Sequence, residues 1–97
     1  MNAELVIDRK VVFADGAILQ MVLWRLPQPD AERPHGFKYR FYYGLADGQC
    51  VVRYDNERGK GDHRHIGDQE ETYVFIDVET LVADFLTDVS KARGGRL

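Results

Sequence analysis

Residues 37–46 carry a strict alternation of side-chain type, and this alternation constrains the fold more than any other feature of the sequence. One side of an extended chain would carry Phe37, Tyr39, Phe41, Tyr43 and Leu45. The other side would carry Lys38, Arg40, Tyr42 and Gly44. Successive side chains of a strand point to opposite faces of the sheet, so a period of two is typical of a strand with one buried face. The segment therefore predicts an antiparallel strand whose aromatic side packs against a core.

A partner strand follows directly, because Asp47-Gly48 is a hairpin signal. Glycine readily adopts the positive φ that a two-residue type I′ turn requires. If these two residues form the turn, the paired residues are Leu45–Cys50, Tyr43–Val52, Phe41–Tyr54, Tyr42–Arg53 and Arg40–Asp55. The first three pairs are apolar or aromatic, and the last pair joins opposite charges. A slip of one residue would turn every side chain to the wrong face, so we expect this register.

The remaining chain predicts further hairpin strands within a single domain over residues 1–97. Strands are expected at about 3–13, 17–26, 37–46 and 49–55, and short strands at about 63–67 and 72–75. Asp15-Gly16 is a second hairpin signal, between the first two strands. All three prolines fall within residues 27–36, which predicts an exposed connection there.

Residues 77–91 predict an amphipathic helix, followed by a flexible tail over residues 92–97. Its single apolar stripe consists of Val78, Leu81, Val82, Phe85, Leu86 and Val89. Asp77 is a suitable N-cap. The expected fold class is therefore α+β: an antiparallel β-sheet of four to five strands built from hairpins, with one C-terminal amphipathic α-helix packed on one face.

The composition excludes several classes of protein. No apolar run reaches the roughly 18–20 residues that cross a bilayer. The N-terminus lacks the basic start and apolar stretch of a secretory signal. The single cysteine, Cys50, cannot form an internal disulfide, and its place in a strand predicts a buried thiol. We therefore expect a cytoplasmic protein with no membrane partner.

The net charge of −3 is not that of a general nucleic-acid binder, which carries a strongly basic face. Basic side chains are nevertheless concentrated in one segment, and they are Arg53, Arg58, Lys60 and Arg64. Any contact with phosphate must therefore be local and made against an acidic background.

The run Asp62-His63-Arg64-His65 holds the strongest candidate chemistry. In an extended chain His63 and His65 share one face, about 6.5–7 Å apart. One imidazole can act as a base toward a ribose 2′-hydroxyl while the other acts as an acid toward the leaving oxygen. The cations expected to hold the substrate phosphate are Arg53, Arg58, Lys60, Arg64 and Arg40. The sequence thus predicts His63 and His65 as catalytic residues toward RNA, with no metal and no other cofactor.

Two other interpretations of this segment stay open. The spacing of His63 and His65 also suits a metal, with Asp62 as a third ligand, although no second cluster with ligand spacing accompanies them. Alternatively, the segment is a salt-bridged polar loop whose histidines are solvated, as His35 is expected to be in the proline-rich connection.

Four tracts of the sequence together resemble the TumE family of bacterial toxin–antitoxin proteins. They are A-E-L-V-I-D-R-K-V-V at the start, V-L-W-R-L-P around Trp24, K-Y-R-F, and R-Y-D-N-E-R-G-K-G-D-H-R-H from Arg53 to His65. The resemblance implies a small cytoplasmic toxin that is encoded beside a helix-turn-helix antitoxin, which neutralises it. We also expect a homodimer.

Resemblance and residues together predict the toxin of a type II toxin–antitoxin system. It would be a metal-independent endoribonuclease that uses the histidine pair and a basic phosphate-binding loop. The alternative is a non-catalytic binding module of a toxin–antitoxin pair that acts through the same loop.

Overall fold

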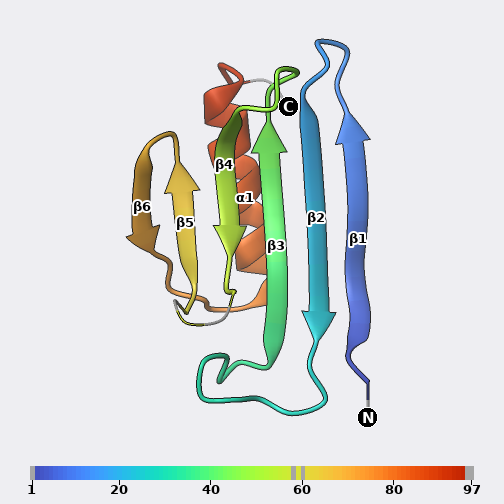
Figure 1. Cartoon of the computed structure of the whole chain (residues 1–97), viewed down its shortest axis with the longest axis vertical. Helices are drawn as coiled ribbons and strands as arrows, with labels where there is room; N and C mark the ends of the chain where they lie inside the picture. The colour runs from blue at the N-terminus through green and yellow to red at the C-terminus, as the bar shows by residue number, and fades with distance from the viewer. Residues whose placement is uncertain (1, 58, 60, 96–97) are drawn as a thin grey trace.

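A computed structural model describes residues 2–57, 59 and 61–95, which form an antiparallel sheet and one helix (Figure 1). The strands are β1 Glu4–Val12, β2 Ile18–Arg25, β3 Phe37–Gly44, β4 Cys50–Asp55, β5 His63–Ile66 and β6 Gln69–Thr72. The helix α1 spans Val78–Ala92. The strands lie side by side in chain order, so each strand pairs with its neighbours in sequence.

The expected fold class is confirmed, but the sheet has six strands and not four to five. The last strand was expected at about 72–75 and instead occupies Gln69–Thr72. All four of its residues are exposed and polar, so β6 lacks the apolar pattern by which a strand is predicted. It forms because it pairs with β5 across the short turn after Ile66.

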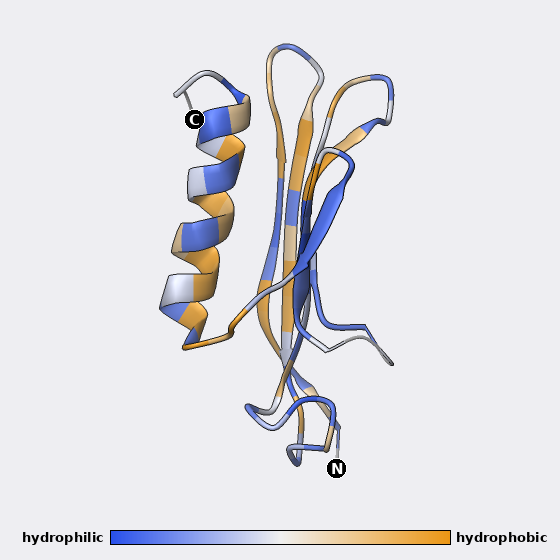
Figure 2. Ribbon diagram, turned by 90° about the vertical axis from the view of Figure 1, so that its left-hand side faces the viewer, coloured by the Kyte–Doolittle hydropathy of each residue, from blue (hydrophilic) through white to orange (hydrophobic). Residues whose placement is uncertain are grey.

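The helix covers one face of the sheet with its apolar stripe (Figure 2). Leu81, Phe85 and Val89 are fully buried, as the stripe predicts. The ring of Phe85 meets Phe41 and Tyr54 edge-on, with centroid distances of 5.3 and 5.6 Å. The core therefore lies between α1 and the middle strands. No described helix is long and apolar enough to cross a membrane.

Polar contacts fix the helix over the sheet. Asp77 caps α1, because its side chain accepts a hydrogen bond of 2.7 Å from a backbone N–H of the first turn. The Tyr73 hydroxyl donates to Asp84 at 2.7 Å, and the Tyr54 hydroxyl donates to Asp88. Burial and these carboxylates raise the pKa of both tyrosines, so both hydroxyls keep their proton and remain donors.

The predicted pairing of β3 with β4 is confirmed along most of its length. The observed pairs are Arg40–Asp55, Phe41–Tyr54, Tyr42–Arg53 and Tyr43–Val52. At the loop end, Cys50 pairs with Gly44 and not with Leu45, because the register shifts there. Val51 is the extra residue of this bulge.

The two hairpin loops have three residues, whereas two were predicted. They are Ala14-Asp15-Gly16 and Ala46-Asp47-Gly48, the same tripeptide. In each loop the glycine N–H donates at 2.9 Å to the carbonyl three residues earlier, and the glycine φ is +86° or +90°. This is a type I turn closed by a glycine in the left-handed region. The added loop residue and the β4 bulge offset each other. The predicted register is therefore confirmed beyond the bulge, whereas the pair Leu45–Cys50 and the turn type were wrong.

Residues 92–95, predicted as the start of a flexible tail, end the helix and contact the sheet. The guanidinium of Arg93 lies 3.9 Å from the ring centroid of Phe13 and donates to the Tyr43 hydroxyl at 2.9 Å. Residues 96 and 97 lie outside the described part of the chain.

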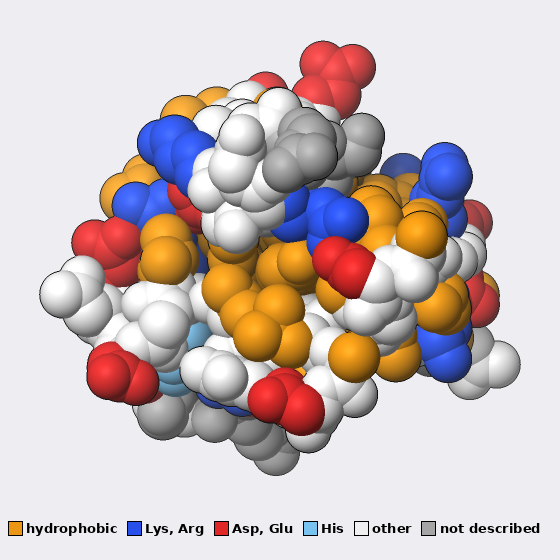
Figure 3. All heavy atoms as spheres, turned by 90° about the horizontal axis from the view of Figure 1, so that it is seen from above, with side chains coloured by type: hydrophobic (Ala, Val, Ile, Leu, Met, Phe, Trp, Pro, Cys, Tyr) orange, Lys and Arg blue, Asp and Glu red, His pale blue; other side chains and the backbone are white. Residues whose placement is uncertain are grey.

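The helix covers the sheet incompletely on the side of β1 and β2. Ile7 and Val11 of β1, and Val82 and Leu86 of α1, stay partly exposed. The end-on view of Figure 3 shows hydrophobic side chains at the surface between the helix and the strands. On the opposite face of the sheet, no described helix or strand forms a second layer (Figure 2). That open face carries the polar side of β3, as the alternation predicts.

We expect Gly16→Ala and Gly48→Ala to lower the free energy of unfolding, and Gly16→Ala to lower it more. The positive φ costs an L-residue about 1–2 kcal/mol at either position. A Cβ on Gly48 would meet nothing within 4 Å, whereas a Cβ on Gly16 would lie 2.8 Å from the Cβ of Ala46. Urea denaturation followed by circular dichroism measures both changes.

The double variant Gly16→Ala/Ala46→Gly is the control for this comparison. This variant should recover the part of the free energy of unfolding that the steric contact removes, and it should still lack the part that the positive φ removes. Equal losses at the two glycines would contradict the contact between the two loops.

Candidate functional site

The predicted site lies on the open face, where strand pairing aligns two polar rows. One row is Arg40–Asp55–His63–Thr72, and the other is Tyr42–Arg53–His65–Glu70. Directly paired residues place their Cβ atoms about 4.5–5.5 Å apart on one face. The rows are two residues apart along each strand, so both point to the same side. Pairing thus brings together His63, His65 and Arg53 of the sequence prediction.

His63 forms the floor of this cluster and is 5% exposed. Its Nδ1 lies 2.9 Å from the carbonyl oxygen of Gly61, and its Nε2 lies 2.7 Å from Oδ1 of Asp55. Both neighbours are acceptors, although only the contact with Gly61 is aligned as a hydrogen bond. Each ring nitrogen of His63 therefore faces an oxygen.

His65 lies at the rim, with its side chain 21% exposed. Its Nε2 lies 2.8 Å from Nη2 of Arg53, and since a guanidinium only donates, this nitrogen must accept. Burial lowers the pKa of His65, and the positive charge of Arg53 lowers it further, whereas Glu70 acts in the opposite direction. His65 is therefore mainly unprotonated at neutral pH.

The two imidazoles are neighbours with opposite surroundings. Their ring centroids lie 5.2 Å apart and the rings are nearly perpendicular. His63 faces two acceptors, whereas His65 faces a donor. Such a pair can both release and accept a proton within one site.

Arg53 and Asp55 form the charged centre between these rings. Arg53 Nε lies 3.0 Å from Oδ2 of Asp55. The residue Asp55 is only 4% exposed. The ion-pair contacts are close but poorly aligned, so Arg53 Nε and Asp55 Oδ1 have no hydrogen-bond partner among the described residues. Buried polar atoms without an aligned partner cost free energy. Arg53 and Asp55 are therefore held together by charge and not by an aligned hydrogen bond between Nε and the carboxylate.

Arg40 lies opposite Asp55, as predicted, but the two do not form the expected ion pair. Within the described residues, the ion-pair partners of Asp55 are Arg53 and His63. Arg40 is exposed and makes no ion pair in that part of the chain. It is therefore a cation on the open face that is available to a ligand.

Arg64 lies on the helix side of the sheet, away from the histidine pair. Its Nε lies 2.5 Å from Glu71, and its Nη1 lies 3.1 Å from the Tyr54 hydroxyl and 3.3 Å from Asp88. The structure therefore does not bring Arg64 together with His63 and His65. The other two predicted phosphate-binding cations, Arg58 and Lys60, lie outside the described residues.

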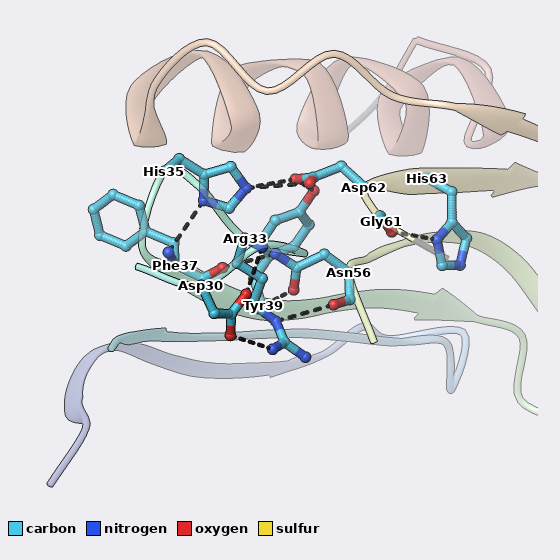
Figure 4. A network of polar contacts seen from close by, with 9 residues as sticks. All are labelled: Asp30, Arg33, His35, Phe37, Tyr39, Asn56, Gly61, Asp62 and His63. Carbon is cyan, nitrogen blue, oxygen red and sulfur yellow. Dashed lines mark hydrogen bonds and ion pairs between the residues drawn. The ribbon is translucent and has the colours of Figure 1, made fainter. Parts of the chain in front are cut away.

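A buried network ties the proline-rich connection to the segment before β5 (Figure 4). His35 Nδ1 accepts a hydrogen bond of 3.1 Å from the backbone N–H of Phe37, so its Nε2 carries the proton. That Nε2 donates to Asp62 at 3.0 Å, and the Tyr39 hydroxyl donates to the same carboxylate at 2.7 Å. The His35 ring also stacks on Phe75, with centroids 4.0 Å apart.

These contacts correct two interpretations of the sequence. His35 is not a solvated loop histidine, because only 15% of its side chain is exposed. Asp62 is not a third metal ligand beside His63 and His65, because its carboxylate is bound to His35 and Tyr39 on the helix side.

Asn56 holds the end of β4 in place. Its Oδ1 accepts from the backbone N–H of Tyr39 at 3.0 Å, and its Nδ2 donates to the carbonyl of Phe37 at 2.7 Å. Its own carbonyl accepts from Arg33 Nε at 3.2 Å, and the residue is 1% exposed. The side chain thus continues the pairing of β4 with β3 and fixes the position of the adjacent Asp55.

Sequence reasoning missed Glu70, whose carboxylate lies 3.4 Å from His65 Nε2. A signal was present, because Gly67-Asp68 can form a two-residue turn that places Glu70 opposite His65. Asn56 left no comparable signal, since its role depends on the loop that meets it.

Among the described residues, His63, His65 and Glu70 are the group that could hold a metal ion, with ligand atoms within 4.8 Å of one another. Two imidazoles and a carboxylate suit several divalent metals. However, the Arg53 guanidinium contacts His65 Nε2 at 2.8 Å and places a positive charge beside that ligand atom. This charge disfavours a metal ion at that ligand atom.

The fold and this cluster define a small α+β protein that carries a histidine–arginine site on the open face of its sheet. The chain matches the family described as Toxin TumE over residues 2–93, nearly its whole length, and the protein belongs to that family. Membership implies a toxin of a toxin–antitoxin system, with an antitoxin as its partner. No curated protein and no solved structure matches the chain.

We expect His65 to titrate below about 6.5, the ordinary value for histidine. Arg53→Gln should raise the midpoint, because it removes the positive charge beside the ring, while Arg40→Gln should leave it unchanged. The measurement is an NMR titration of the imidazole carbon-bound protons.

The lowered pKa of His65 also determines how the stability of the fold depends on pH. The folded protein binds fewer protons at His65 than the unfolded chain does below pH 6.5, so this contribution is present above that pH and is lost as the pH falls. A His65 midpoint at or above 6.5 would contradict the contact with Arg53.

Proposed function

We propose that the protein inhibits growth by cleaving RNA, as a metal-independent endoribonuclease that acts on the open face of the sheet. The observation that carries this proposal is the opposite surroundings of two neighbouring imidazoles. His65 accepts a hydrogen bond from Arg53, whereas His63 faces two acceptors. Acid–base catalysis needs one group of each kind within reach of the same phosphodiester.

In the proposed reaction, His65 removes the proton of a ribose 2′-hydroxyl, and the 2′-oxygen attacks the adjacent phosphorus. The bond from phosphorus to the 5′-oxygen breaks, and His63 gives its proton to that oxygen. The products carry a 2′,3′-cyclic phosphate and a 5′-hydroxyl, so no co-reactant is needed. DNA lacks the 2′-hydroxyl, which makes the reaction specific to RNA.

The charge that develops on the phosphate requires a cation that is already in place. Arg53 is held beside both His65 and Asp55, and Arg40 is exposed on the same face. Arg58 and Lys60 are retained as proposed phosphate contacts. Arg64 is omitted, because its contacts with Glu71 and Asp88 hold it on the helix side.

The biological setting follows from the same proposal. The toxin would act in the cytoplasm as part of a type II system, and a helix-turn-helix antitoxin would neutralise it. The expected homodimer stays a prediction.

We expect His65→Gln to reduce RNA cleavage by about 10²–10⁴-fold, because the variant loses the general base. Growth inhibition on expression without antitoxin should be lost in parallel. Cleavage of a defined RNA, with the fragment ends identified by mass spectrometry, measures the rate and detects the cyclic phosphate.

The matched control is Glu71→Gln, which changes a residue of β6 whose side chain faces the helix. The ion pair between Glu71 and Arg64 is exposed, so losing it should lower the stability of the fold only slightly. Chelator should not change the rate. Undiminished cleavage by His65→Gln would reject the mechanism, and so would loss in chelator with recovery on addition of one divalent ion.

One observation favours a second candidate, a binding module that inhibits growth without cleaving RNA. His63 is nearly fully buried and engages both ring nitrogens, as a histidine with a structural role does. In this candidate the open face binds its target through Arg40 and Arg53. Growth inhibition that survives His65→Gln but disappears in Arg40→Gln, with cellular RNA intact, would support it.

A further inference from the structure

A shallow depression lies on the open face beside the histidine cluster, over β2 and β3. Its volume is ≈ 260 Å³, and Trp24, Lys38, Arg40 and Tyr42 are among the residues that line it. Pockets for drug-sized ligands measure about 300–1,000 Å³. This smaller and open hollow therefore suits a single flat group such as a nucleobase.

The ring of Tyr42 lies across Gly44. A Cβ on Gly44 would lie 2.1 Å from the Tyr42 Oη and 2.6 Å from its Cζ, so only glycine leaves room for the ring. Gly44 is buried although it belongs to the open face. Its φ is not positive, so its backbone conformation alone does not require glycine. The hydroxyl end of the Tyr42 ring therefore lies over the backbone of Gly44, and the ring stays partly exposed.

Two cations without an ion pair among the described residues precede this ring on the same face of β3, Arg40 two residues before Tyr42 and Lys38 four residues before it. Lys38 and Arg40 are exposed, and neither makes an ion pair within the described residues. The Arg40 guanidinium carbon lies 6.0 Å from the Tyr42 ring centroid. Glu57 is the carboxylate that lines the depression, and Asp8 lies farther out, on β1 opposite Val22. The balance of charge at the ring is therefore positive.

We infer that this depression binds an unpaired nucleotide of single-stranded RNA, with the base stacked on Tyr42 and a phosphate on Lys38 or Arg40. Proteins that bind single strands combine aromatic rings for the bases with cations for the backbone, and several do so on an open sheet face. Bases of a duplex are stacked on each other and cannot lie on the ring. The inference rests on the proposed function and adds its substrate class.

The depression lies on the same face of the sheet as the histidine cluster. Tyr42 pairs with Arg53, and Arg53 pairs with His65, so Tyr42 and His65 are two strand spacings apart, about 10 Å. One strand of RNA crossing the sheet can therefore place a base on Tyr42 and a nearby phosphodiester at His65. The stacked base would hold that phosphodiester in register.

Trp24 allows binding to be measured without cleavage. It is the only tryptophan of the chain, and it lines the depression. The probe is a short single-stranded oligonucleotide with 2′-O-methyl sugars, which lacks the hydroxyl that the proposed cleavage requires. We expect it to quench the fluorescence of Trp24, and we expect the same oligonucleotide annealed to its complement to bind more weakly.

Variants test the stacking itself. Tyr42→Ala should weaken binding of the probe by about 5- to 150-fold, the range for loss of one stacked base, while Tyr42→Phe keeps the ring and should bind nearly as the parent does. Arg40→Gln should also weaken binding, and its matched control Arg9→Gln, an exposed arginine on the helix-facing side of β1, should not. Circular dichroism confirms that each variant is folded.

Failure of this inference can be told apart from failure of the proposed function. Binding of the probe that depends on Tyr42, without cleavage of natural RNA, would support the inference and reject the nuclease. Equal binding of single strand and duplex would overturn the inference, and so would undiminished binding by both Tyr42→Ala and Arg40→Gln.

Discussion

The pairing register of β3, β4 and β5 is the constraint on which the open face depends. In this register Arg53 stands between Tyr42 and His65. A slip of one residue would place Tyr54 there and send Arg53 into the core, because side chains alternate between faces. Phe41 and Tyr54, both fully buried against the helix, oppose that slip. Apolar packing beneath the sheet thus determines which polar groups meet above it.

Polar groups on the two faces of the sheet differ in how completely they are satisfied. On the helix side, three tyrosine hydroxyls each donate to a carboxylate, in the pairs Tyr39–Asp62, Tyr54–Asp88 and Tyr73–Asp84. Among the described residues, the buried side-chain atoms without a hydrogen-bond partner are Arg53 Nε and Asp55 Oδ1 on the open face and Arg93 Nε at the end of the helix. Satisfied networks give rigidity, whereas unsatisfied buried groups need an explanation such as a ligand. Two of these three atoms lie beside the histidine pair, where we place the proposed function.

The parts of the fold that could be predicted from the sequence are those that depend on a pattern within one segment. The alternation in residues 37–46 and the stripe of α1 are periodic, so the β3–β4 register and the helix were predicted. The polar strand β6 has no apolar period, and it exists only because β5 offers it a partner.

The candidate site shows the same division between local and distant information. The histidine pair was visible as a motif. Asp55 was assigned to the wrong partner, because Arg40 faces it across the sheet whereas Arg53, its observed partner, lies two residues earlier on the same strand. The contacts of His35 and Asn56 come from a loop that returns over long sequence separations, which no spacing within one segment reveals.

The acidic balance of the chain is compatible with a ligand that is an anion, but it limits how that ligand is held. Asp55 already forms an ion pair with Arg53, so a phosphate at the histidine cluster meets a cation that is partly neutralised. The affinity for RNA must then come largely from contacts outside the cluster. These are the cations Lys38 and Arg40 and a surface that binds without charge. The partly exposed ring of Tyr42 is the surface we propose, because stacking needs no counterion. Binding through few phosphate contacts and one stacked base should depend only weakly on salt, unlike the binding of a strongly basic protein.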